Sequence, residues 1–225
     1  MTRTQTGPRG KTAGEAQTVS AAAARLGALA RVNWWLWLIP PAVLAGWVGW
    51  ANTWGYHPAL PAWLETAAIW LVAAATTVLA ARTCLTRNPL HLIVTVLAAN
   101  LLCREIHFAG TTTAVFVVGG LCVAWAVLWR EKIARAGRDS RFVSWLLAAL
   151  WAYLLSQLVA KRIFSARHLG WIPNEQAIHT SLEEVVETAA HLMFLAAALV
   201  GSWWRWGRPA EPAGPAPASD RTGDA

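Results

Sequence analysis

Six blocks of apolar residues follow one another along the chain, each close to the length that a helix needs to cross a bilayer. They cover Trp34–Thr53, Ala62–Ala81, Pro89–Phe108, Thr112–Trp129, Phe142–Ala160 and Ser181–Trp204. A spanning helix takes about 20 such residues. The blocks lack the alternation of apolar and polar residues that barrel strands show, which leaves helices as the structure that satisfies the backbone in lipid. The pattern therefore predicts an all-α, polytopic membrane bundle of six transmembrane helices.

Polar segments flank this apolar region at both ends of the chain. Residues 1–31 are polar and basic, which predicts a disordered cytoplasmic N-terminus, and its Ala-rich part is compatible with a short surface helix. Residues 207–225 are rich in Pro and Ala and predict a disordered cytoplasmic tail. Residues 32–206 then form one transmembrane domain, in which we see no internal repeat.

The basic residues predict the orientation. Of the 19 Lys and Arg residues, 15 lie in the N-terminus, the C-terminus, the second-to-third loop and the fourth-to-fifth loop. The positive-inside rule therefore places both termini in the cytoplasm. The net charge of +7 does not indicate nucleic-acid binding, because the anionic inner leaflet accounts for basic residues at helix ends. We expect a multi-pass integral protein of the bacterial plasma (inner) membrane, with the lipid bilayer as partner and no nucleic acid; the oligomeric state is not indicated.

The last apolar block carries ionisable residues on one face. At 100° per residue, Glu183, Glu184, Glu187 and His191 fall within about 100° of one another. Ionisable side chains at membrane depth are costly and usually face a protein interior or a water-filled cavity. This face is therefore the strongest indication of a functional site.

Structural explanations cover part of the pattern. Ser181 with Glu184, or Thr180 with Glu183, fits a capping box at the start of a helix. Glu187 and His191 lie deeper, where an i,i+4 pair that satisfies itself within the core is the alternative to a functional site.

The third block supplies a second polar cluster. Arg104, Glu105 and His107 lie near its end, which the orientation places on the same side of the membrane as the start of the sixth block. Arg104 could instead extend to the outer interface, with Glu105 paired locally. In the fifth block, Tyr153 and Gln157 are expected to make interhelical hydrogen bonds.

Carboxylates and imidazoles that meet in a low dielectric need a cation, protons or paired charges. We expect His107, Glu187 and His191 to bind a divalent metal, for which Zn, Fe and Mn are the candidates. Glu183, Glu184 or Glu105 would be the general base, and Arg104 would hold an anionic headgroup or developing negative charge. The leading hypothesis is a metal-dependent, hydrolase-type enzyme that acts on a lipid or lipid-linked substrate in the outer half of the bilayer.

Two motifs resemble those of known intramembrane enzymes. Cys103-x-x-x-His107 and Glu187-x-x-x-His191 resemble the paired motifs of the alkaline ceramidase and adiponectin-receptor superfamily, which implies zinc and lipid amide hydrolysis. Here Cys replaces Ser, Glu replaces a His ligand, and six spans replace seven. Glu183-Glu184 resembles the start of the Glu-Glu-x-x-x-Arg motif of prenyl-protein-type intramembrane proteases, but Thr188 stands in the last position. The chain is assigned to neither family.

Two other functions fit the same residues. A proton- or cation-coupled carrier could use Glu187 and His191 as a relay. A non-catalytic assembly or accessory protein could use buried ions to fix the register of its helices.

Overall fold

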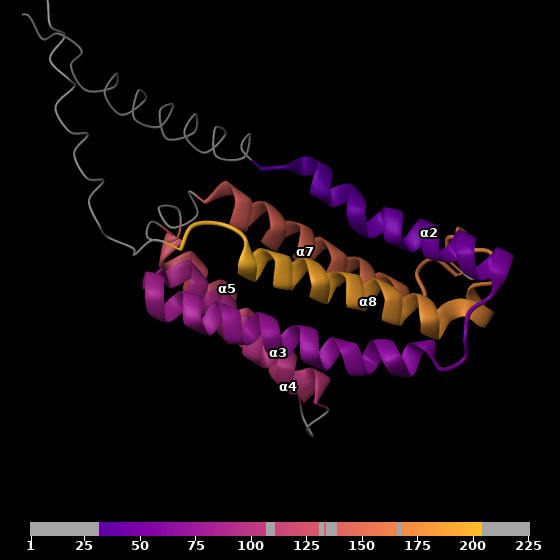
Figure 1. The fold of residues 1–225 in the computed structure, drawn as a ribbon, viewed down its shortest axis with the longest axis horizontal. Helices are drawn as coiled ribbons and strands as arrows, with labels where there is room; N and C mark the ends of the chain where they lie inside the picture. Colours follow the sequence, from indigo (N-terminus) through magenta and orange to yellow (C-terminus); the bar gives the residue numbers. More distant parts are fainter. Residues whose placement is uncertain (1–31, 107–110, 131–132, 134–138, 166–167, 204–225) are drawn as a thin grey trace, which may run out of the picture.

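The computed structural model describes residues 32–106, 111–130, 133, 139–165 and 168–203, and within these ranges it is all-helical, without a strand (Figure 1). The elements are a 3₁₀ helix η1 (Trp34–Leu38) and the α-helices α2 (Ile39–Trp54), α3 (Leu60–Thr86), α4 (Pro89–Glu105), α5 (Thr111–Leu128), α7 (Ser140–Ala160) and α8 (Glu175–Leu199). The predicted all-α class is confirmed for this part of the chain. The predicted terminal segments 1–31 and 207–225 lie outside the described residues.

Each of the six apolar blocks contains a helix, but the helices differ in their capacity to span a membrane. Among the described residues, α3 and α7 are long and apolar enough to cross a bilayer, each with a mean hydropathy of 1.7. Helix α2 has 16 residues and α4 has 17, and the described part of α5 is similarly short. Helix α8 has 25 residues but carries several glutamates. Length and composition thus mark two candidate spans.

Helix α8 lies at the centre of the bundle, between α3 on one side and α2 and α7 on the other (Figure 1). Its buried Ala190 and Phe194 belong to a core that also includes residues of α3, α4 and α7. Its buried Leu182 and Val186 belong to a second core with residues of α2 and α7. Because protein covers it on several faces, α8 can carry ionisable side chains that point into the bundle rather than outward.

Helix α8 begins earlier than its apolar block predicts. It starts at Glu175, directly after Asn174, whose φ of 52° is left-handed. Glu183 and Glu184 therefore lie about two turns inside the helix. The Ser181 hydroxyl donates to the carbonyl oxygen of Ile178 at 2.8 Å. The interpretation of these residues as a capping box is wrong, because the helix does not begin there.

The C-terminal end of α8 is held by Arg82, a basic residue that directly follows the predicted span Ala62–Ala81. Arg82 lies within α3, is fully buried, and forms an ion pair with Asp139 at 3.3 Å. Its guanidinium donates to four carbonyl oxygens, those of Ala197 and Ala198 in the last turn of α8 and those of Val200 and Ser202 just after it. The last carbonyls of a helix lack partners within the helix. Arg82 satisfies them, and so fixes the position of α8 along α3.

Candidate functional site

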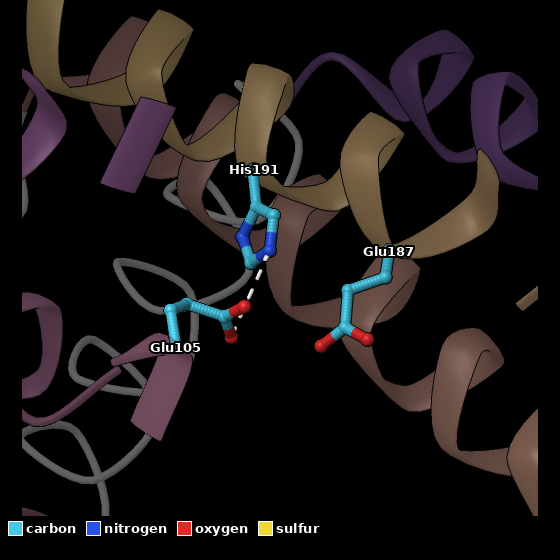
Figure 2. A group of neighbouring side chains, drawn as sticks. All are labelled: Glu105, Glu187 and His191. Carbon is cyan, nitrogen blue, oxygen red and sulfur yellow. Dashed lines mark ion pairs between the residues drawn. The ribbon is translucent and has the colours of Figure 1, made fainter. Parts of the chain in front are cut away.

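Three ionisable side chains from two helices meet inside the bundle. Glu105 is the last residue of α4, and Glu187 and His191 lie on successive turns of α8. All three residues are buried, and each offers one ligand atom within 4.8 Å of the other two. Figure 2 shows the three side chains directed toward a common space between α4 and α8. We call Glu105, Glu187 and His191 the triad.

His191 is oriented by Tyr153 of α7. The Tyr153 hydroxyl lies 2.7 Å from Nδ1 of His191, and the rings meet edge to face. Nε2 of His191 is on the other side of the ring, 3.9 Å from Oε1 of Glu105 (Figure 2). His191 has no exposed surface, and this Nε2 has no hydrogen-bond partner in the described part of the chain. A buried imidazole nitrogen aimed at two carboxylates is a suitable metal ligand.

Arg104 provides the positive charge beside the triad. Its Nη1 lies 2.8 Å from Oε1 of Glu187 and 3.9 Å from Oε1 of Glu105. With both carboxylates ionised and the imidazole neutral, the four groups carry a net charge of −1. A divalent cation would change this to +1, and it would also draw the carboxylates and the imidazole together.

The donor set fits a metal with an open coordination position. Two carboxylates and one imidazole are oxygen and nitrogen ligands of the kind that Zn²⁺, Fe²⁺ and Mn²⁺ accept. Tetrahedral ligands 2.0–2.1 Å from a metal lie about 3.3–3.4 Å apart. The separations of up to 4.8 Å in the triad are wider, so binding requires side-chain movement of about 1 Å. Three protein ligands leave the fourth position for water or substrate.

The other predicted site residues are distributed differently. His107 lies outside the described residues, so its expected role as a ligand stays a prediction. Glu105, expected as a general base, is instead a member of the triad. Glu183 lies in the N-terminal half of α8, with Oε2 at 3.7 Å from Nε2 of His179. Glu184 is half-buried and close enough to Glu187 to interact with it electrostatically.

The sequence pattern did not indicate that two residues at the start of α8, Glu175 and His179, belong to the polar face of this helix. Glu175 and His179 are a contacting pair, with Oε1 of Glu175 at 2.8 Å from Nδ1 of His179. Together with Glu183, Glu187 and His191 they place an ionisable residue at every fourth position of α8. The same i,i+4 spacing that linked Glu187 to His191 could have extended the pattern toward the start of the helix.

An apolar cavity of about 400 Å³ adjoins the triad between α4, α5 and α7. Arg104 and Tyr153, which contact triad residues, are also part of the cavity lining. Leu97, Phe116 and Leu150 supply much of the apolar wall. The cavity therefore ends in polar groups at the triad.

Comparisons with protein-family models, with curated proteins and with solved structures found no match to this chain.

Proposed function

We propose that the chain is a multi-pass integral protein of a bacterial plasma (inner) membrane, in which all six helical segments cross the bilayer and both termini are cytoplasmic. The distribution of basic residues supports this orientation. The outer surface supports membrane residence, because large apolar side chains such as Trp70 of α3 and Phe116 and Leu128 of α5 are strongly exposed. Apolar surface of this kind is typical of contact with lipid or another protein.

Within this membrane protein, the triad binds one divalent metal, Zn²⁺, Fe²⁺ or Mn²⁺, and serves a hydrolase-type reaction on a lipid or lipid-linked substrate. The observation that carries the proposal is the position of Arg104 and Tyr153. Both contact the triad, and both line the apolar cavity. Clefts that combine an apolar lining with a few convergent polar groups are typical of small-molecule sites.

Each polar group then has a role. Glu105, Glu187 and His191 would hold the metal, and the chemistry it would supply is a lower pKa for a bound water and polarisation of a carbonyl oxygen of the substrate. Tyr153 fixes the orientation of His191. Arg104 orients Glu187, and its remaining guanidinium donors would stabilise negative charge on the substrate. Glu184 would accept the proton from water.

The test uses full-length protein in proteoliposomes of phosphatidylethanolamine and phosphatidylglycerol, supplied in turn with Zn²⁺, Fe²⁺ and Mn²⁺. Mass spectrometry of the lipids should show a metal-dependent cleavage product with the native protein and none with His191→Ala. His57→Ala is the matched control, because His57 is exposed in the connection between α2 and α3. The proposal is contradicted if no lipid species changes with metal, or if His191→Ala retains the activity.

A non-catalytic assembly role is the second candidate, and one observation favours it. Arg104 and Glu187 form an ion pair at 2.8 Å that needs no metal, and such pairs can fix helix register. For this role, Glu187→Gln combined with His191→Ala should lower stability or complex formation while no turnover is found for the native protein. The carrier hypothesis stays a prediction from the sequence, tested by pH-dependent flux into liposomes that Glu187→Gln abolishes.

A further inference from the structure

The cavity beside the triad has residues of α5 in one wall and residues of α7 in another. Helix α5 packs along α4 and makes no comparable contact with another described helix. Val115, Phe116 and Gly119 of α5 nevertheless line the cavity opposite Leu146 and Leu150 of α7. The two helices are therefore separated by the cavity rather than by packed side chains.

The polarity of the lining changes from one end of the cavity to the other. Arg104, Tyr153 and Gln157 lie toward the ends of α4 and α7 that lie beside the triad. Leu97 and Leu146 lie about two turns away from them along the same helices, and Asn100 is the polar lining residue between Leu97 and Arg104. A molecule that matches this lining has a polar group at one end and a hydrocarbon chain at the other.

We propose that the cavity between α4, α5 and α7 binds one hydrocarbon chain of a membrane lipid, which enters sideways between α5 and α7 and places its polar linkage beside Arg104 and Tyr153. This inference rests on the proposed function, because it names where the lipid substrate lies. Helix α5 supports sideways access, since Phe116, which lines the cavity, is itself strongly exposed, and Val117, Leu121 and Val123 of the same helix are exposed apolar residues. A cavity of about 400 Å³ is also within the range of ligand pockets.

Gly119 is a position from which a larger side chain would fill part of the cavity. It lines the cavity, and a Cβ at this position meets no atom within 4 Å. A large side chain at position 119 can therefore extend into the cavity, where the hydrocarbon chain of the lipid would lie, without a clash at its Cβ. Gly120 is its matched neighbour: it also has no atom within 4 Å of a Cβ, it is exposed, and it does not line the cavity.

The experiment compares Gly119→Phe with Gly120→Phe in the full-length protein. Each protein is placed in nanodiscs that contain phosphatidylcholine with a photoactivatable diazirine in one acyl chain, and the labelled peptides are mapped by mass spectrometry. Labelling near Trp70, which is exposed on α3, serves as the internal reference for ordinary surrounding lipid. Native protein and Gly120→Phe should label the cavity segments 115–119 and 146–150 above this reference, and Gly119→Phe should reduce that labelling to the reference level.

Equal labelling of the cavity segments in all three proteins would overturn the inference. Metal content, measured on the same samples, separates it from the proposed function. If the protein contains stoichiometric metal and Gly119→Phe does not change the labelling, only the proposed binding site for the hydrocarbon chain is overturned. If the protein contains no metal and Gly119→Phe reduces the labelling, the binding site for the hydrocarbon chain is supported and the metal-dependent function is overturned.

Discussion

The Tyr153 hydroxyl lies 2.7 Å from Nδ1 of His191, and this contact determines how His191 can bind a metal. A neutral imidazole has one protonated nitrogen and one with a free electron pair. For Nε2 to be the ligand, Nδ1 must carry the proton and donate it to the Tyr153 oxygen. In that tautomer Nε2, which faces Glu105, has the free electron pair that binds a metal.

Removing this contact should weaken metal binding without destroying the site. We expect Tyr153→Phe to lower the affinity for Zn²⁺ by about 10–100-fold, because outer-shell partners of a ligating histidine typically contribute that much. The measurement is competition with a fluorescent zinc chelator in detergent. Tyr56→Phe is the control, since Tyr56 bonds the Ala177 carbonyl far from the triad and its loss should leave the affinity unchanged. Equal affinities for native protein and Tyr153→Phe would show that Tyr153 does not orient the ligand.

Arg104 should matter most when the metal is absent. In Arg104→Gln the carboxylates of Glu105 and Glu187 lose their nearby cation, so we expect the free energy of unfolding to fall by roughly 1–3 kcal/mol. Added Zn²⁺ should recover part of this loss, because the metal neutralises the same carboxylates.

Thermal unfolding with and without Zn²⁺ measures both effects. The control is Arg162→Gln, whose side chain is 52% exposed and 4.0 Å from Glu175, so its cost should stay below about 1 kcal/mol. A Zn²⁺ response that is absent from Arg104→Gln and from the native protein alike would contradict the electrostatic account of the triad.

Arg82 should be among the most sensitive positions for stability. Arg82→Met leaves the Asp139 carboxylate and the carbonyl oxygens at the end of α8 without their donor, and we expect a cost of about 3–5 kcal/mol. Arg82→Lys should not restore stability, because an ammonium lacks the planar set of five donors. Denaturant unfolding in detergent measures this, with exposed Arg141→Met as the control. A native-like midpoint for Arg82→Met would show that α8 is held in another way.

Replacing glycine by alanine should destabilise the protein at Gly201 and stabilise it at Gly49. Gly201 has a φ of 102°, and a Cβ there would lie 2.7 Å from Nη2 of Arg82 and in collision with the Asp139 carboxylate. Gly201→Ala should therefore lower the free energy of unfolding by about 1 kcal/mol or more. Gly49 lies inside α2 with open space around it, so Gly49→Ala should raise that free energy by roughly 0.5–1 kcal/mol. Thermal unfolding should show midpoints that move in opposite directions; an unchanged or raised midpoint for Gly201→Ala would contradict the described end of α8.

The positions of the helices could be predicted from apolar blocks, but their ends could not. Helix α7 begins at Ser140 and ends at Ala160, close to the predicted Phe142–Ala160. Helix α8 begins at Glu175, six residues before the apolar block at Ser181. The polar residues Glu175 and His179 contact each other within the helix, so hydropathy alone gives the wrong start.

Contacts between segments that are distant in the sequence also could not be predicted from the sequence. Arg82 directly follows the predicted span Ala62–Ala81 and is one of the basic residues that we assigned to the loop between the second and third spans. Its partners, however, lie more than 50 positions away, in Asp139 and at the end of α8. Arg104 and Glu105 are neighbours in sequence at the end of α4, and Arg104 reaches Glu187 while Glu105 reaches His191, because α8 packs at the centre of the bundle. Periodicity orders the residues of one helix and does not determine which helix it meets.

The metal content of the purified protein tests the account most directly. Elemental analysis should find one divalent metal ion per native chain and none in His191→Ala or Glu105→Gln, while His57→Ala keeps the native amount. Native protein without stoichiometric metal after Zn²⁺, Fe²⁺ and Mn²⁺ have each been supplied, or His191→Ala with the same metal content as the native chain, would contradict the assignment of Glu105, Glu187 and His191 as a metal site.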